Sequence, residues 1–166
     1  MARDSETPVT DTAAVAERYA AWVGEALELA ARTSGSDDVP VGAVVIGADN
    51  VVIGRGRNVR EQLGDPTGHA EIMALREAAA AIGSWRLDGA TLVATLEPCV
   101  MCAGAALSAR IGRLVYGAAD LKAGASASLY NVLADPRLNH NPPVAHGVLA
   151  RECGELITAF FTERRR

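Results

Sequence analysis

The 166-residue sequence is poor in several informative residue types. It has only three cysteines, a single lysine and 4% aromatic residues, and an odd, small cysteine count argues against a disulfide-stapled fold. No apolar run approaches the roughly 18 residues that a membrane-spanning helix needs. The polar, acidic start also lacks the basic and apolar regions of a signal peptide. We therefore expect a cytoplasmic protein that makes no contact with a membrane.

The rest of the composition is that of an ordinary globular chain. Hydrophobic residues make up 49% and charged residues 22%. The length favours one domain, expected over residues 12–166, after a disordered tail over residues 1–11. The net charge of −4 is uneven, because residues 1–40 hold eight acids and three arginines whereas the remainder holds 12 acids and 13 bases. The overall acidity therefore does not exclude a nucleic-acid partner.

Apolar spacing and turn residues predict alternating helices and strands. The expected strands are 41–46, 51–54, 91–96 and 113–116, the first two forming a hairpin. The expected helices are 12–33, 69–81, 98–109 and 153–165. The segments 55–68 and 117–144 are expected to be mostly loop, with a short helical piece near 129–134. This order predicts an α/β domain whose mixed sheet is covered on its faces.

Two short motifs at predicted helix starts carry chemistry. His69 and Glu71 form H-A-E, and Cys99 and Cys102 follow Pro98 in P-C-V-M-C. One imidazole and two thiolates suit Zn²⁺ and leave a fourth tetrahedral position for water, as in catalytic zinc sites. Glu71 is then placed to act as the base that manages the proton of that water.

Other interpretations of these residues stay open. The two cysteines fit a closed structural zinc site in which Cys153 or another histidine is the fourth ligand, or a redox pair. Cys153 itself fits a small buried apolar residue in the last helix. His140 and His146 have no ligand spacing and are left unassigned.

The H-x-E and P-C-x-x-C motifs together resemble the signature of zinc nucleobase deaminases. The resemblance extends to VPVGAVV, DPTGHAEIMALR, TLEPCVMCAGAALSARIGRLVYGAAD and GVLARECGELITAFF, which are similar to bacterial tRNA adenosine deaminases. It covers residues 13–165. Members of that family convert the wobble adenosine of an arginine tRNA anticodon to inosine.

The resemblance implies a three-layer α/β/α, cytidine-deaminase-like fold with about five strands. It implies one zinc ion per chain held by His69, Cys99 and Cys102, with Glu71 as the proton carrier. It also implies a homodimer that completes the pocket edge across its interface, and an anticodon stem-loop of tRNA as partner. The substrate-binding residues that it implies are Asn58 for the flipped adenine, and Asp120, Lys122, Phe160, Phe161, Arg164 and Arg165 for the RNA.

Two stretches depart from the family pattern. The family often has KTGAAGSL where this chain has Lys122 followed by AGASAS and Leu129, so the backbone there is expected to differ. The acidic N-terminal extension has no counterpart. Two rival functions remain: a deaminase of free guanine, cytosine or nucleotides, which would share the zinc residues, and a non-catalytic, zinc-stabilised RNA-binding module.

Overall fold

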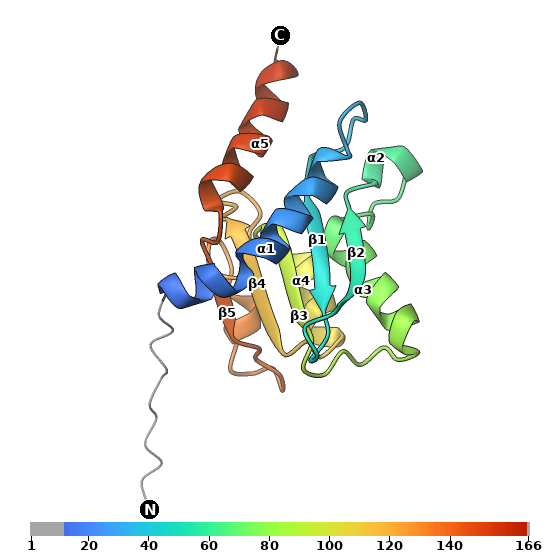
Figure 1. The fold of residues 1–166 in the computed structure, drawn as a ribbon, viewed down its shortest axis with the longest axis vertical. Helices are drawn as coiled ribbons and strands as arrows, with labels where there is room; N and C mark the ends of the chain where they lie inside the picture. Colours follow the sequence, from blue (N-terminus) through green and yellow to red (C-terminus); the bar gives the residue numbers. More distant parts are fainter. Residues whose placement is uncertain (1–11, 166) are drawn as a thin grey trace, which may run out of the picture.

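The computed structural model describes residues 12–165, so the tail predicted for residues 1–11 lies outside the described residues. A five-stranded sheet forms the centre (Figure 1). Its strands are β1 Gly42–Ile46, β2 Val52–Arg57, β3 Thr91–Leu96, β4 Arg113–Ala118 and β5 Val144–His146. The helices are α1 Thr12–Ala31, α2 Arg60–Leu63, α3 Ala70–Ile82, α4 Val100–Ser108 and α5 Ala150–Glu163, with a 3₁₀ turn at Val132–Ala134. None of the helices in residues 12–165 is both long and apolar enough to cross a bilayer.

The strand order is β2-β1-β3-β4-β5. Strand β1 is antiparallel to both of its neighbours, β2 and β3, whereas β3, β4 and β5 are parallel. Strands β2, β3 and β4 therefore run in the same direction, and their carboxyl ends meet at one edge of the sheet. Ligands of open α/β sheets bind outside this edge.

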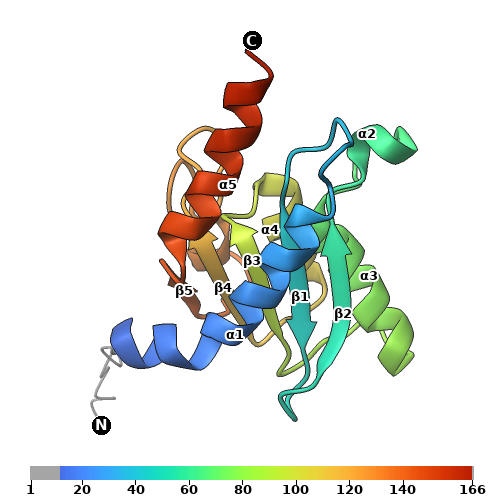
Figure 2. The ribbon, with the colours of Figure 1, turned by 45° about the horizontal axis from the view of Figure 1, so that its top comes forward.

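Helices cover both faces of the sheet. Helices α3 and α4 lie on one face, and α1 and α5 lie on the other (Figure 2). A hydrophobic core lies on each face of the sheet. Alternate residues of β3 point into the two cores, because Leu92 and Ala94 pack with α3 and α4 while Val93 packs with α1 and α5. The three-layer α/β/α architecture and the five-stranded mixed sheet are confirmed.

Glycines in β2 let α3 lie directly on the strand. A Cβ atom at Gly54 would be 2.3 Å from the carbonyl oxygen of Ala74, and one at Gly56 would be 2.1 Å from that of Ala70. These distances leave no room for any side chain, so the sequence G-R-G sets how closely the helix approaches. The first turn of α3 is thereby held beside the carboxyl end of β2.

The structure corrects several predicted boundaries. Strand β2 continues to Arg57, where a loop was predicted, and α2 forms within the predicted loop 55–68. The short strand β5 was not predicted, because three residues next to Pro142 and Pro143 give little signal. The last helix starts three residues earlier than predicted, at Ala150.

Candidate active site

A cavity of about 550 Å³ opens at the edge where β2, β3 and β4 end. One wall comes from the segments that flank β1 and β2, and another wall comes from residues 119–123 after β4. Three residues of the two predicted motifs line the cavity, namely His69, Glu71 and Cys99. The fold thus brings both motifs to one cavity.

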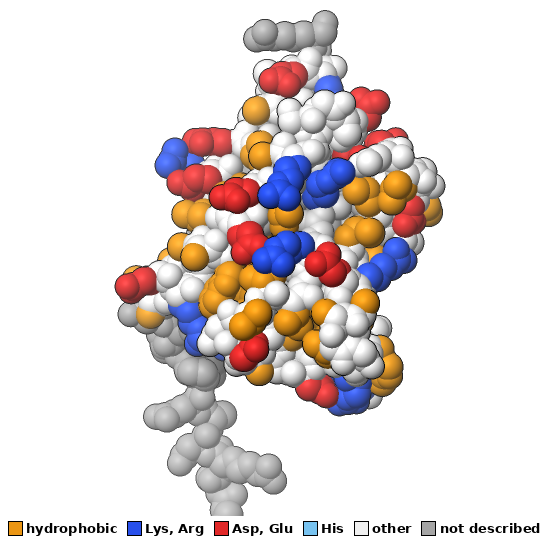
Figure 3. All heavy atoms as spheres, turned by 45° about the vertical axis from the view of Figure 1, so that its right-hand side comes forward, with side chains coloured by type: hydrophobic (Ala, Val, Ile, Leu, Met, Phe, Trp, Pro, Cys, Tyr) orange, Lys and Arg blue, Asp and Glu red, His pale blue; other side chains and the backbone are white. Residues whose placement is uncertain are grey.

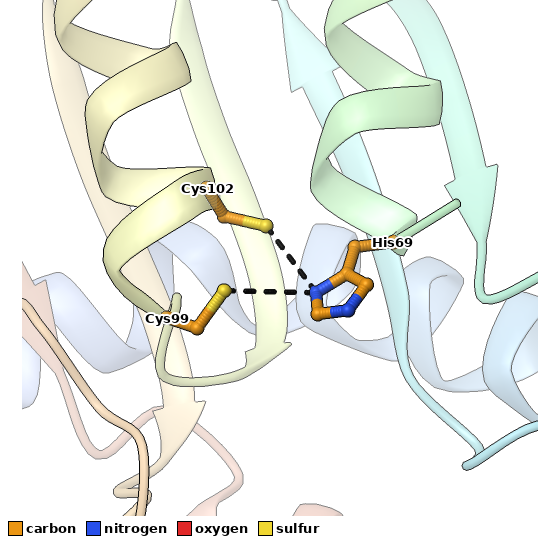
Figure 4. Close-up of side chains that lie close together, drawn as sticks. All are labelled: His69, Cys99 and Cys102. Atoms are coloured by element: carbon orange, nitrogen blue, oxygen red, sulfur yellow. Dashed lines mark hydrogen bonds between the residues drawn. The ribbon is translucent and has the colours of Figure 1, made fainter. Parts of the chain in front are cut away.

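The cluster of His69, Cys99 and Cys102 has the dimensions of a metal site. The Nδ1 atom of His69 lies 3.7 Å from Sγ of Cys99 and 3.5 Å from Sγ of Cys102 (Figure 4). Tetrahedral zinc with Zn–S near 2.3 Å and Zn–N near 2.1 Å would separate these ligand atoms by about 3.6 Å. The donor set and its spacing therefore fit zinc, with one coordination position left over.

Two helix starts hold these ligands. His69 and Cys99 are the N-cap residues of α3 and α4, and Cys102 lies buried in the first turn of α4. The N-terminal end of a helix favours negative charge, which suits thiolate ligands. Among residues 12–165 the cluster has no fourth member. Cys153 lies in the core on the opposite face of the sheet, so the closed site with Cys153 as the fourth ligand is wrong.

The electrostatics of the cluster already favour a thiolate. The hydrogen bond with Cys102, helped by one with His69 and opposed by burial, lowers the pKa of Cys99 to about 4. The same hydrogen bond, together with burial, raises the pKa of Cys102. The hydrogen bond with Cys99 raises the pKa of His69. The metal-free cluster thus shares protons among its members, and a metal ion would displace them.

Glu71 is the second residue of α3 and is 3% exposed. It lines the cavity but does not belong to the cluster of ligand atoms. Burial raises the pKa of its carboxyl group, because a charged carboxylate loses hydration there. A carboxyl group whose pKa is moved toward neutrality is suited to taking up and releasing protons.

Asn58 follows β2 and lines the cavity. Its Nδ2 donates to the carbonyl oxygen of Val39 at 2.9 Å, and its Oδ1 accepts from the N–H of Ala70 at 2.9 Å. The side chain thus joins the chain before β1 to the first residue of α3, next to His69. Its contact with adenine stays a prediction.

Asp120 and Lys122 lie on the wall formed by residues 119–123. Oδ1 of Asp120 accepts from the N–H groups of Lys122 at 2.9 Å and Ala123 at 3.2 Å, which shapes the turn. Glu97, which was not predicted as a site residue, is 2% exposed and also lines the cavity. A lone acid after the apolar strand 91–96 is a signal that could have indicated it, because buried carboxylates need partners.

The remaining predicted residues lie near the end of α5, and only one of them lines the cavity. Phe161 is 43% exposed and lines the cavity. Phe160 packs edge-on against it and under the guanidinium of Arg164, which also pairs with Asp37 and with the carbonyl oxygen of Ser36. Phe160, Arg164 and Arg165 do not line the cavity. Their contacts with RNA stay predictions.

Comparison with known proteins places the site in context. The family model of MafB19-like deaminases matches residues 18–165. The chain is 43% identical over 145 residues to a tRNA-specific adenosine deaminase of Bacillus subtilis, covering 87% of this chain and 89% of the relative. It is 48% identical over 140 residues to a protein of the same description from Haemophilus influenzae, covering 84% and 81%. A tRNA(Ile)-lysidine synthase of Deinococcus radiodurans is 53% identical over 146 residues, which are 88% of this chain but only 25% of that longer protein.

Solved structures have the same fold. A structure from studies of A-to-I editing by tRNA:A34 deaminases superposes with a TM-score of 0.78 at 43% identity, covering 82% of this chain and 98% of the other. A guanine deaminase of Nitrosomonas europaea superposes with a TM-score of 0.75 at 24% identity, covering 86% and 84%. The second likeness concerns the fold alone.

Proposed function

The chain belongs to the MafB19-like deaminases and, among them, to the tRNA-specific adenosine deaminases, and from this premise we propose that it converts adenosine to inosine at the wobble position of an arginine tRNA. The reaction consumes water and releases ammonia. One observation carries the proposal: a buried carboxyl group, Glu71, lines the same cavity as two members of the His-Cys-Cys cluster without being part of that cluster. A purely structural zinc site has no use for such a group.

His69, Cys99 and Cys102 would hold one zinc ion per chain. When bound, zinc lowers the pKa of a water molecule to about 7 and so supplies a nucleophile at neutral pH. Glu71 accepts the proton of the attacking water and delivers it to N1 of the adenine as the bond to C6 forms. Glu71 then takes the proton of the hydroxyl group now on C6 and passes it to the exocyclic amino group, which leaves as ammonia while the C6–O double bond of inosine forms. Its raised pKa suits both halves of this transfer.

The cavity would receive an unpaired base. An anticodon loop can place its wobble nucleotide in a pocket at a lower unstacking cost than a duplex can. Asn58 would bind the adenine, with Asp120, Lys122 and Phe161 contacting the neighbouring RNA and Phe160, Arg164 and Arg165 extending this surface. Acidic and basic side chains alternate on the face drawn in Figure 3. The cavity lining is mixed in the same way, because Asp37, Asp38, Glu61 and Asp120 lie there together with Arg60 and Lys122, so we expect few phosphate contacts and a shallow dependence of RNA affinity on salt.

A second copy of the chain is the proposed partner for an apolar surface next to the site. Val100, Leu129 and Tyr130 are each more than half exposed. The backbone joins their segments, since Ala125 donates to the carbonyl oxygen of Pro98, and Leu129 and Tyr130 donate to that of Gly124. Exposed apolar side chains gathered in this way are typical of interfaces. A homodimer formed here would place the partner at the edge of the cavity, and sedimentation as a monomer at working concentration would contradict it.

The decisive experiment uses the zinc-loaded protein and an anticodon stem-loop of arginine tRNA that carries the wobble adenosine. Sequencing of the product should show inosine at that one position. The matched variant Glu71→Gln should give no inosine while its zinc content stays near one ion per chain. Unchanged RNA with zinc bound would overturn the proposal, and deamination of free guanine or cytosine in the same assay would replace it with a small-molecule activity.

A further inference from the structure

Glu97 is a buried acid that the proposed chemistry does not use. It follows β3 directly and lies two residues before Cys99. Its side chain is 2% exposed, and no arginine or lysine in residues 12–165 forms an ion pair with it. A buried carboxylate without a cation must be stabilised by hydrogen-bond donors. Those donors indicate what the residue does.

All donors to the Glu97 carboxylate come from one distant segment, residues 120–128. Oε1 accepts from the N–H groups of Ser126 at 3.0 Å, Ala127 at 2.8 Å and Ser128 at 2.9 Å. Oε2 accepts from the N–H of Asp120 at 3.0 Å and from the hydroxyl of Ser128. The segment therefore wraps around the carboxylate. The carboxylate oxygens accept the hydrogen bonds that backbone carbonyl oxygens would accept in a helix or strand.

Gly124 allows this close approach. A Cβ atom at this position would lie 2.4 Å from both Cδ and Oε2 of Glu97, and 2.5 Å from the carbonyl oxygen of Asp120. Any other residue would push the segment away from the carboxylate. The backbone also pairs with the metal-binding turn, because Gly124 bridges to Cys99 and Ala125 donates to the carbonyl oxygen of Pro98.

The wrapped segment begins as a wall of the cavity, formed by residues 119–123. The turn Glu97–Cys99 thus supplies a metal ligand at one end and anchors this wall at the other. We propose that Glu97 is a positioning residue that holds the segment 119–128 as the RNA-facing wall, at a fixed place relative to the metal-binding turn. The RNA part of this inference rests on the proposed function.

The first test needs no catalysis. In Glu97→Gln the amide nitrogen would face donors that now meet a carboxylate oxygen, so the wall loses part of its anchor. Hydrogen–deuterium exchange of the zinc-loaded protein should become about tenfold or more faster for amides of residues 118–130 and stay unchanged in α3. Ser128→Ala removes one donor and should give a smaller change of the same kind. Unchanged exchange in the folded Glu97→Gln protein would overturn the inference, whether or not the RNA is deaminated.

The second test separates binding from chemistry. Because the wall moves while the metal ligands and Glu71 stay, KM for the stem-loop should rise about tenfold in Glu97→Gln, with a much smaller change in kcat and one zinc ion retained. Gly124→Ala should act in the same direction, and Glu77→Gln, an exposed acid on α3, should match the original protein. Faster exchange with unchanged KM would overturn the role in RNA binding. A fall in kcat together with loss of zinc would instead assign Glu97 to the metal site.

Discussion

Replacing Gly56, in β2, by alanine should disable the active site by displacing the first turn of α3. The added Cβ would lie 2.1 Å from the carbonyl oxygen of Ala70 and 2.6 Å from the nitrogen of Ala74. Carbon and oxygen atoms normally approach no closer than about 3.3 Å, so the first turn of α3 must move by about 1 Å. His69 precedes that turn and Glu71 lies in it, so the metal ligand and the proton carrier move together.

The cost can be approximated for both stability and rate. Overpacking of this kind costs about 1–3 kcal/mol, and each kcal/mol shifts the midpoint of thermal unfolding by about 2–4 °C in a domain of this size. A displacement of about 1 Å at the reacting groups costs on the order of 100-fold in rate. We expect Gly56→Ala to lower kcat by that factor and to weaken zinc binding.

The assay compares zinc affinity by chelator competition, kcat on the stem-loop and the unfolding midpoint. The matched control is Gly154→Ala in α5, where a Cβ would meet no atom within 4 Å. Removing a helical glycine should stabilise that protein by about 0.5–1 kcal/mol and leave kcat unchanged. Wild-type zinc affinity and kcat in a folded Gly56→Ala protein would refute the idea that α3 is seated by this glycine.

Three further outcomes follow from the site. Burial raises the pKa of Glu71 in the folded protein, so its ionisation opposes folding as pH rises through that pKa. In the metal-free protein Glu71→Gln should raise the unfolding midpoint at pH 7.5 but not at pH 4, because only the ionised carboxylate is destabilised by burial, and equal effects at both pH values would contradict this. Phe161→Ala should raise KM for the stem-loop about tenfold by removing a stacking surface worth about 1–3 kcal/mol, whereas Phe160→Ala, outside the cavity lining, should change it less; the reverse order would contradict the assignment. Chelation should lower the unfolding midpoint, and adding zinc should restore it, because a ligand bound only by the folded state stabilises it; an unchanged midpoint would argue against binding at this cluster.

Local signals account for the parts of the fold that were predicted from the sequence. The helix beginning near His69 ends at Gly83, which has the left-handed conformation expected of a helix C-terminus. Strand β2 was cut short because Gly54 and Gly56 are typical of loops. In the folded chain they are required by the contact with α3, which the sequence of the strand alone does not reveal. The expected helix end and the missed strand end thus both depend on glycine, in one case through local conformation and in the other through packing.

The candidate site was likewise predicted where a residue carries a local signal and missed where its role depends on distant contacts. The spacing of His69, Cys99 and Cys102 predicted the cluster because each metal ligand carries its own chemical signature. Glu97 carries only the weaker signal of a lone acid after an apolar strand, and its role depends on donors about 30 residues further along the chain. Asn58 has a conformational role that was not predicted, because its partners Val39 and Ala70 lie in other elements.

The positions of the two chain ends matter for anything attached to them. Helix α1 begins at the end of the molecule away from the cavity, whereas α5 rises beyond the sheet edge at which the cavity opens (Figures 1 and 2). Phe161 reaches the cavity only a few residues before the end of the described chain. A tag, surface anchor or second protein module joined before α1 would leave the approach of a folded RNA free. The same attachment after Arg165 would stand beside the mouth of the cavity and compete with the RNA for space.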